Sequence, residues 1–138
     1  MAVPFRTSRR VEFVDTDVAG IAHFSNFFRW MESAEVEMLR SFGLSVKMVW
    51  QDQELGFPRV AAACDYLRPV TFEDLLDISV RVERVGTKSV TYAFEFAKDG
   101  EAVARGKVTA VCVRMHADRS FESVELPATI RAKLEPGV

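Results

Sequence analysis

The clearest pattern in the chain is a set of apolar residues at three- and four-residue spacing between positions 27 and 42. This spacing predicts a helix with one continuous apolar stripe, made of Phe27, Trp30, Met31, Ala34, Met38 and Phe42. Four charged residues are expected to lie largely off the stripe, namely Glu32, Glu35, Glu37 and Arg40. Either Ser25 or Asn26 is expected to cap the start of the helix, and Gly43 is expected to end it in a left-handed conformation.

Most of the remaining chain alternates between apolar and polar residues at period two, which is the pattern of half-buried strands. Residues 5–14 form the first predicted strand, and residues 44–56 are predicted to be a mixed loop or short helix. Asp99-Gly100 is a strong hairpin signal, because both positions tolerate positive φ. The other predicted strands cover residues 57–67, 75–85, 88–97 and 103–115, with a short last strand within residues 121–126.

This order of elements predicts a single α+β domain over residues 1–138. Strands joined mostly by short turns favour a largely antiparallel sheet of five to six strands, with the one long helix packed on it. The segment Val108–Val113 is apolar on both faces apart from Thr109. One face can pack on the helix and the other needs a cover of its own, which indicates a second subunit.

Composition and charge narrow the classes of partner. The 138 residues carry a net charge of −2, so no overall positive field attracts nucleic acid or an anionic membrane. No apolar run approaches the roughly 20 residues that span a bilayer, and the first residues lack the apolar stretch of a signal peptide. Cys64 and Cys112 have no metal-ligand spacing and are interpreted as reduced core thiols. We therefore expect a cytoplasmic protein without a metal site.

Two acidic residues stand where the first predicted strand gives way to the helix. Asp15 and Asp17 precede Gly20, where the backbone can approach a ligand closely. This place is also near the helix N-terminus, whose unpaired amides and dipole favour negative charge. One site can therefore combine a reactive carboxylate with donors to an oxyanion, the two groups that thioester hydrolysis needs. We expect Asp15 to bond backbone amides of the turn, which leaves Asp17 for the chemistry.

The residues around this turn resemble the signature of hotdog-fold thioesterases, and most closely the 4-hydroxybenzoyl-CoA thioesterase subgroup with its relatives that cleave other acyl-CoA esters. The similarity runs over most of the chain. It implies a hotdog fold, hydrolysis of an acyl-CoA to free acid and CoA, no cofactor, and a homodimer or homotetramer with its pocket between subunits. The matching residues are Asp15-Thr16-Asp17, Gly20, His23-Phe24, Asn26-Phe27-Phe28, Glu32, Tyr66-Leu67-Arg68-Pro69 and Lys88-Ser89.

The resemblance also implies roles for three residues near the helix start. Asp17 would be the catalytic carboxylate, acting either as nucleophile to form a mixed anhydride or as general base on water. The Phe24 amide would donate to the oxyanion. His23 stands where relatives often carry Tyr or Trp. It would either protonate the leaving thiolate or orient water near neutral pH, or form a wall of the pocket.

Substrate contacts follow from the same resemblance. Glu32 matches an acidic position that faces the ring hydroxyl in the hydroxybenzoyl enzyme, with a solvated helix glutamate as the alternative. Lys88 falls where relatives bind CoA phosphates, and Arg84 is close to it in sequence. Gly86-Thr87 replaces a basic pair of some relatives. The alternative for Lys88 and Arg84 is therefore that they are solvated charges at a strand end. The expected substrate-binding set is Glu32, Asn26, Lys88, Arg84 and Ser89.

Three other classes compete with this interpretation. An Asp-x-Asp after an apolar strand also opens phosphatases of the haloacid dehalogenase type, but Ala19 replaces their usual Thr or Val, and the strand–helix repeats of a parallel sheet are missing. His23-Phe24 is similar to the His-Phe of hotdog acyl-thioester dehydratases, whose following Pro and Gly are absent. The third class is a hotdog module that binds acyl-CoA without turnover. The acyl group, and the choice between CoA and acyl-carrier protein, stay open.

Overall fold

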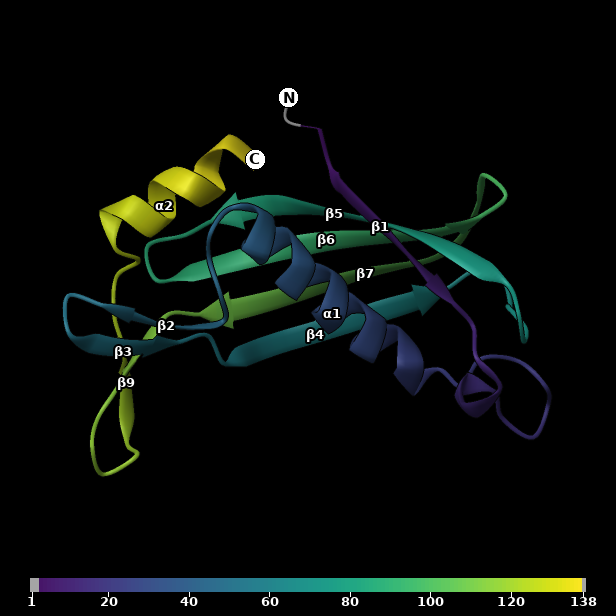
Figure 1. The fold of residues 1–138 in the computed structure, drawn as a ribbon, viewed down its shortest axis with the longest axis horizontal. Helices are drawn as coiled ribbons and strands as arrows, with labels where there is room; N and C mark the ends of the chain where they lie inside the picture. The colour runs from purple at the N-terminus through teal and green to yellow at the C-terminus, as the bar shows by residue number, and fades with distance from the viewer. Residues whose placement is uncertain (1–2, 138) are drawn as a thin grey trace.

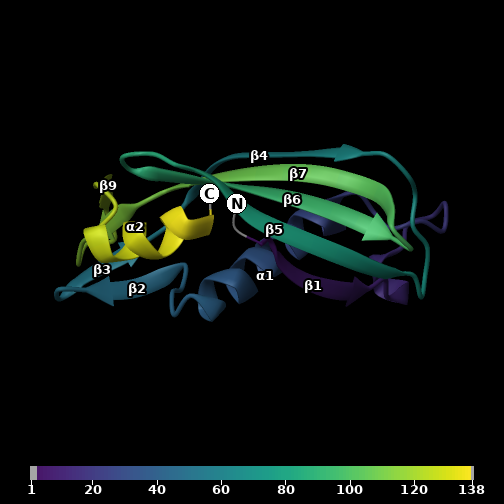
Figure 2. The same ribbon diagram turned by 90° about the horizontal axis from the view of Figure 1, so that it is seen from above.

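The computed structural model describes residues 3–137, which form two α-helices and two antiparallel sheets (Figure 1). The long helix α1 (Ser25–Ser41) lies across one face of the main sheet (Figure 2). This arrangement confirms the predicted α+β class. The main sheet has the strand order β1-β5-β6-β7-β4, and its strands are β1 (Phe5–Arg10), β4 (Arg59–Tyr66), β5 (Leu75–Val85), β6 (Ser89–Lys98) and β7 (Glu101–Val111).

The face of α1 that packs on the sheet is the apolar stripe predicted from the sequence. Five of its six residues are buried, and Phe42 is partly buried. Glu35 is also buried, with 1% of its surface exposed, so the expectation that it lies off the stripe is wrong. It stands four positions after Met31 and three before Met38, and residues at these spacings share one side of a helix.

The start of α1 differs from the prediction, whereas its end agrees with it. The N-cap residue is Phe24, whose side chain makes no capping hydrogen bond, so the prediction of a Ser25 or Asn26 cap is wrong. At the other end, Gly43 has a φ of +77°. The N–H of the next residue donates to the Leu39 carbonyl at 2.8 Å, which completes a left-handed helix end.

The hairpin between β6 and β7 has the predicted turn. Asp99 and Gly100 both have positive φ, at 49° and 81°, and the strands pair from Lys98 opposite Glu101 onward. This pairing fixes the register that turns one side of both strands toward α1. The inner positions of β5, β6 and β7 supply much of the core, including Ile78, Val80, Val82, Val90, Tyr92, Phe94, Phe96, Val103 and Val108.

Residues 44–56 contain a strand pair, so the prediction of a loop or short helix is wrong. β2 (Lys47–Trp50) pairs with β3 (Gln53–Gly56), and a second sheet is completed in the order β2-β3-β8-β9 by β8 (Val113–Met115) and β9 (Phe121–Ser123). The turn residues Gln51 and Asp52 have positive φ. Because the turn contains no Gly or Asn, the sequence carries no strong hairpin signal there.

Two predicted strands are shorter than expected. The first ends at Arg10, and residues Phe13–Asp15 form a 3-10 turn. The strand predicted over residues 103–115 is divided at Cys112, whose N–H donates to the Lys88 carbonyl at 2.7 Å. After this break the chain enters the second sheet as β8, which takes part of the doubly apolar segment away from the main sheet.

The chain after β9 forms a helix that the sequence patterns did not reveal. α2 (Ala128–Leu134) is followed by a 3-10 turn over Glu135–Gly137. α2 has seven residues, so its apolar positions do not complete two full turns of a recognisable stripe. Ile130 and Leu134 are nevertheless buried, and they attach the end of the chain to the core.

Strand β4 forms an edge of the main sheet, because within residues 3–137 it pairs with β7 on one side only. Its outward surface is apolar and small: Val60 is 62% exposed, and Ala61, Ala62 and Ala63 are exposed as well. An uncovered edge with small apolar side chains can pair with a strand of another chain. Cys64 of this strand is a free thiol, as is Cys112.

Candidate active site

The turn that carries Asp17 is a tight loop closed by its own backbone. The Asp17 N–H donates to the Ile21 carbonyl at 2.8 Å, and the Gly20 N–H donates to the Asp17 carbonyl at 2.9 Å. Gly20 has a φ of +81°, a conformation that glycine adopts without strain. The Asp17 Oδ1 accepts from the Ala19 N–H at 2.8 Å. The half-buried carboxylate is therefore fixed through one oxygen.

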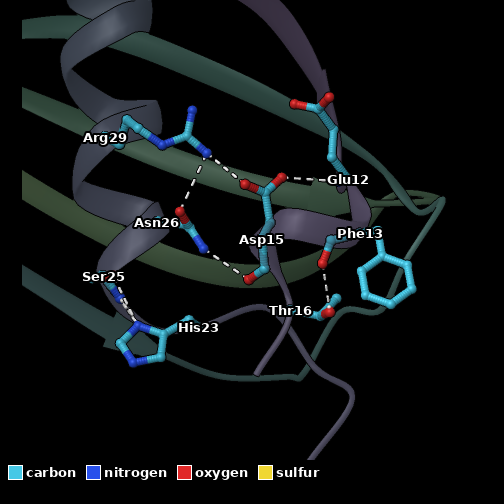
Figure 3. A network of polar contacts seen from close by, with 8 residues as sticks. All are labelled: Glu12, Phe13, Asp15, Thr16, His23, Ser25, Asn26 and Arg29. Atoms are coloured by element: carbon cyan, nitrogen blue, oxygen red, sulfur yellow. Dashed lines mark hydrogen bonds and ion pairs between the residues drawn. The ribbon is translucent and has the colours of Figure 1, made fainter. Parts of the chain in front are cut away.

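Asp15 holds this loop against the first turn of α1 (Figure 3). Its buried carboxylate accepts the Glu12 N–H through Oδ2 at 2.8 Å and Arg29 Nη2 through Oδ1 at 2.6 Å. Its carbonyl oxygen accepts from Asn26 Nδ2 and from the His23 N–H, both at 2.8 Å. The bond to Glu12 agrees with the expected role of Asp15 in bonding backbone amides.

The side chains of Asn26 and His23 are engaged with their neighbours. Asn26 Oδ1 accepts from Arg29 Nη2 of the same helix at 3.2 Å, so both ends of its side-chain amide have partners. His23 is exposed, and its Nδ1 accepts from the Ser25 N–H at 3.3 Å. The same Nδ1 lies 2.8 Å from Ser25 Oγ, and which of these two atoms donates depends on the tautomer of the ring. The ring also stacks on Phe24, with centroids 4.6 Å apart.

The Phe24 N–H is an available donor at the start of α1. Within residues 3–137 this N–H has no hydrogen-bond acceptor, and the Phe24 side chain does not cap the helix. N–H groups of a first helical turn have no partner inside the helix, and the helix dipole gives this end a partial positive charge. The Phe24 N–H is therefore suited to an anion or a developing oxyanion.

Asp17 and Phe24 line one cavity of about 510 Å³ between the acidic loop, the start of α1 and the segment that follows β4. Most of the residues that form the walls of this cavity were not predicted as site residues from the sequence. The segment Tyr66–Pro69 carried a signal, because it belongs to the matching motif, but no function had been attached to it. The other lining residues are Ile21, Ala22, Phe27, Tyr66, Leu67, Arg68, Pro69 and Val70.

The predicted phosphate-binding residues lie at the opposite end of the sheet from Asp17. The Asp17 loop bridges Thr71 through Ile21, and Asp74, just beyond Thr71, forms an ion pair with Lys98 at 2.8 Å. Lys98 is the last residue of β6, a strand of ten residues that spans roughly 30 Å. The structure therefore does not bring Asp17 together, within one chain, with the residues at or near the other end of β6: Arg84, Lys88 and Ser89.

Glu32 is exposed on α1 and is not among the residues that line the cavity. The carboxylate that the fold buries is Glu35. Its Oε2 forms an ion pair with Arg59 Nη2, and its buried Oε1 has no hydrogen-bond partner within the described residues. Burial raises the pKa of Glu35 to about 7, although Arg59 lowers it.

No group of three His, Cys, Asp or Glu side chains in residues 3–137 is placed to hold a metal ion. None of the helices there has the length and apolar character needed to cross a membrane.

The fold and the site define a class of protein: a hotdog domain with a carboxylate and a free helix N–H at one apolar cavity. Residues 11–134 match the family model described as the Thioesterase-like superfamily. The chain belongs to this family. The antiparallel sheets also exclude the phosphatase alternative, which requires a parallel sheet.

Individual relatives and solved structures that resemble this chain are named as thioesterases or hydrolases of CoA esters. A 1,4-dihydroxy-2-naphthoyl-CoA hydrolase of Nostoc punctiforme is 32% identical over 132 residues, which cover 95% of this chain and 86% of that protein. The structure of a gentisyl-coenzyme A thioesterase superposes with a TM-score of 0.77 at 25% identity, covering 95% of this chain and 99% of the other. A 4-hydroxybenzoyl CoA thioesterase complexed with 4-hydroxybenzoyl CoA has the same fold, with a TM-score of 0.82 at 19% identity and coverage of 96% and 99%. The chain is a thioesterase that hydrolyses CoA thioesters.

Proposed function

We propose that Asp17 is the catalytic carboxylate and that the Phe24 N–H stabilises the oxyanion of the reaction. The observation that carries this proposal is that both residues line the same cavity. One offers a carboxylate oxygen, and the other offers an N–H without an acceptor among the described residues. Donors fixed in advance beside an apolar cavity stabilise developing charge without reorganisation. This is the main requirement for attack on a thioester carbonyl.

Two routes use the same carboxylate. In the first, an Asp17 oxygen bonds to the acyl carbon, the C–S bond breaks, CoA leaves as the thiolate, and water then hydrolyses the mixed anhydride. In the second, Asp17 takes a proton from a water molecule that attacks the acyl carbon directly, and the C–S bond of the tetrahedral intermediate then breaks to release the acid and the CoA thiolate. Both routes place negative charge on the former carbonyl oxygen, where the Phe24 N–H donates. Hydroxylamine added during turnover traps an anhydride as the hydroxamate, and an amount above that formed directly from the thioester in the presence of Asp17→Asn indicates the first route.

We further propose that the working unit contains a homodimer paired along β4. A second copy that pairs antiparallel along this strand is related by a two-fold axis. The strands of the partner's sheet would then run opposite to those of the first sheet. The end of the partner's sheet that carries Lys88 would therefore lie beside the Asp17 loop. In this arrangement the partner's Lys88 would come near Asp17, although the two positions lie at opposite ends of the sheet within one chain. Lys88, Arg84 and Ser89 would then bind the CoA phosphates from across the interface.

We also propose that the acyl group of the substrate is a hydroxylated aromatic acid. The three relatives described above are named for 1,4-dihydroxy-2-naphthoyl, gentisyl and 4-hydroxybenzoyl esters of CoA. In this chain the cavity wall contains three aromatic rings, Phe24, Phe27 and Tyr66, and aromatic side chains pack favourably on an aryl group. Glu32 would approach the ring hydroxyl once the second subunit is in place.

The proposed substrate class is tested by thiol release from a panel of CoA esters. The panel holds 4-hydroxybenzoyl-CoA, 1,4-dihydroxy-2-naphthoyl-CoA, benzoyl-CoA, acetyl-CoA and palmitoyl-CoA, each monitored with a thiol reagent. We expect kcat/KM to be highest for the two hydroxyaryl esters. A clear preference for an aliphatic ester would contradict the proposed substrate class, and binding of all esters without thiol release would favour a non-catalytic module.

A further inference from the structure

Tyr66 makes a contact between the main sheet and the start of α1 that the motif analysis did not assign. It is the last residue of β4, and its hydroxyl donates to the Phe24 carbonyl at 2.9 Å. Its ring packs edge-on against Phe27, with centroids 5.2 Å apart, and against Phe24 at 6.5 Å. The hydroxyl therefore binds the residue whose N–H is the oxyanion donor of the proposed mechanism.

The other bonds around Phe24 come from nearby in the sequence. The Asn26 N–H donates to the His23 carbonyl at 3.0 Å, and the His23 N–H donates to the Asp15 carbonyl at 2.8 Å. These bonds fix the helix start relative to the acidic loop. The bond from Tyr66 spans 42 positions and fixes the same residue relative to the opposite wall of the cavity.

We propose that Tyr66 is a positioning residue for thioester hydrolysis, whose hydroxyl holds Phe24 so that its N–H meets the reacting carbonyl oxygen. This inference rests on the proposed function. An oxyanion donor acts only when it is correctly placed, and a small displacement of a catalytic group costs much of its effect. The substrate needs no contact with the Tyr66 hydroxyl for this role.

The Tyr66 hydroxyl remains a donor over the working pH range. Desolvation and the neighbouring Cys64 raise the pKa of Tyr66 to about 12. The proton therefore stays on the oxygen under all conditions in which a CoA ester is assayed, and the bond to the Phe24 carbonyl keeps its direction. Loss of the hydroxyl should lower the rate by a similar factor at every pH, because Asp17 is unchanged.

The test is Tyr66→Phe, which removes the hydroxyl and keeps the ring against Phe27. We expect kcat to fall about tenfold, with KM within about twofold of wild type. The matched control is Thr91→Val, which removes the hydroxyl that bonds Thr109 at 2.9 Å on the other face of the sheet. It should leave kcat unchanged. A purely structural role of Tyr66 would instead lower the unfolding temperature and leave kcat intact, and that result would overturn the inference.

A second measurement does not depend on turnover. In ¹H–¹⁵N spectra of the full-length protein, Tyr66→Phe should move or broaden the Phe24 and Ser25 amide signals, while Thr91→Val should leave them in place. Unchanged signals in Tyr66→Phe would overturn the positioning role even if no CoA ester were hydrolysed. Inactivity of the wild type on every ester would count against the proposed function alone, and the two failures are thus distinguishable.

Discussion

The buried carboxylate of Glu35 in the middle of α1 forms an ion pair with Arg59, the first residue of β4. Arg59 also donates through Nη1 to the Phe57 carbonyl. The pair therefore ties the long helix to the beginning of the edge strand. Because the second oxygen of Glu35 is buried without a hydrogen-bond partner in the described residues, the charged form is only partly compensated.

This pair predicts a pH-dependent stability. The pKa of Glu35 is raised from 4.5 to about 7 in the folded chain, so the folded state binds a proton more tightly than the unfolded state. Stability from this group is fully present below about pH 4.5 and is lost as pH rises to about 7, by about 3 kcal/mol in total. Urea unfolding between pH 4.5 and 8 should show this decline, and Glu35→Gln should remove most of it.

The control for that experiment is Glu37→Gln on the same helix. Glu37 is more exposed and pairs with Arg9 at 2.9 Å. This variant should keep the decline of the wild type between pH 4.5 and 7. An equal decline in Glu35→Gln and in wild type would show that Glu35 is not the responsible group.

Asp15 should matter for stability more than its small side chain suggests. Asp15→Ala leaves the Glu12 N–H and Arg29 without their carboxylate partner, which should lower the free energy of unfolding by about 2–3 kcal/mol. Asp77→Ala, at an exposed position of β5, should change it by less than about 0.5 kcal/mol. Denaturant titrations of both variants measure the difference, and equal stabilities would refute the anchoring role of Asp15.

We expect that His23 does not donate a proton to the leaving thiolate and only packs beside the start of α1. Its ring is exposed, its Nδ1 accepts from Ser25, and it does not line the cavity. The alkaline limb of the kcat profile should therefore persist in His23→Ala. If the limb flattens instead, leaving-group protonation belongs to His23.

The dimer proposal makes a prediction for the β4 edge. Ala62→Glu places two carboxylates close to the two-fold axis, and we expect it to give a folded monomer with little activity. Ala117→Glu, in an exposed loop, should leave the assembly unchanged. Light scattering after size-exclusion chromatography gives the mass of each variant. A dimer of wild-type strength in Ala62→Glu would contradict pairing along β4.

A mixed dimer tests whether the site is shared between subunits. Asp17→Asn and Lys88→Ala chains are inactive or weak by themselves in this proposal. Co-expressed, they form a dimer in which one of the two sites combines an intact Asp17 with an intact Lys88. When this heterodimer is separated from the two homodimers through different affinity tags, its thiol release should recover to about half of the wild-type rate at subsaturating substrate. Activity no greater than that of the separate variants would place both residues in the same subunit's site.

The sequence predicted the elements whose signals are local. The stripe of α1, the end of this helix at Gly43 and the turn at Asp99-Gly100 follow from spacing and backbone preference, and the structure has all three. The hairpin at Gln51 and Asp52 was missed, because two ordinary residues adopt positive φ there. The burial of Glu35 was missed as well, since a charged residue is expected at the surface unless its partner is known.

The site was predicted less completely than the fold. The motif identified Asp17 and Phe24, which share a cavity wall. Tyr66 and Arg68 also line this cavity, because they stand at and just after the end of β4. They lie more than 40 positions after Asp17, and no spacing rule along the chain connects them with it. The separation of Lys88 from Asp17 also depends on the strand order. In the sheet, the first residue of β6 lies at the end away from the Asp17 loop, and Lys88 directly precedes this residue.

The central claim concerns the carboxylate of Asp17, and its most direct test is the rate of thiol release by Asp17→Asn. The variant keeps the side-chain shape and an oxygen able to accept from Ala19, so the loop should fold as in wild type. With the best ester of the panel, we expect kcat to fall by a factor on the order of 10³ or more, while Asp77→Asn stays within about twofold of wild type. A kcat of Asp17→Asn close to that of wild type would contradict the account.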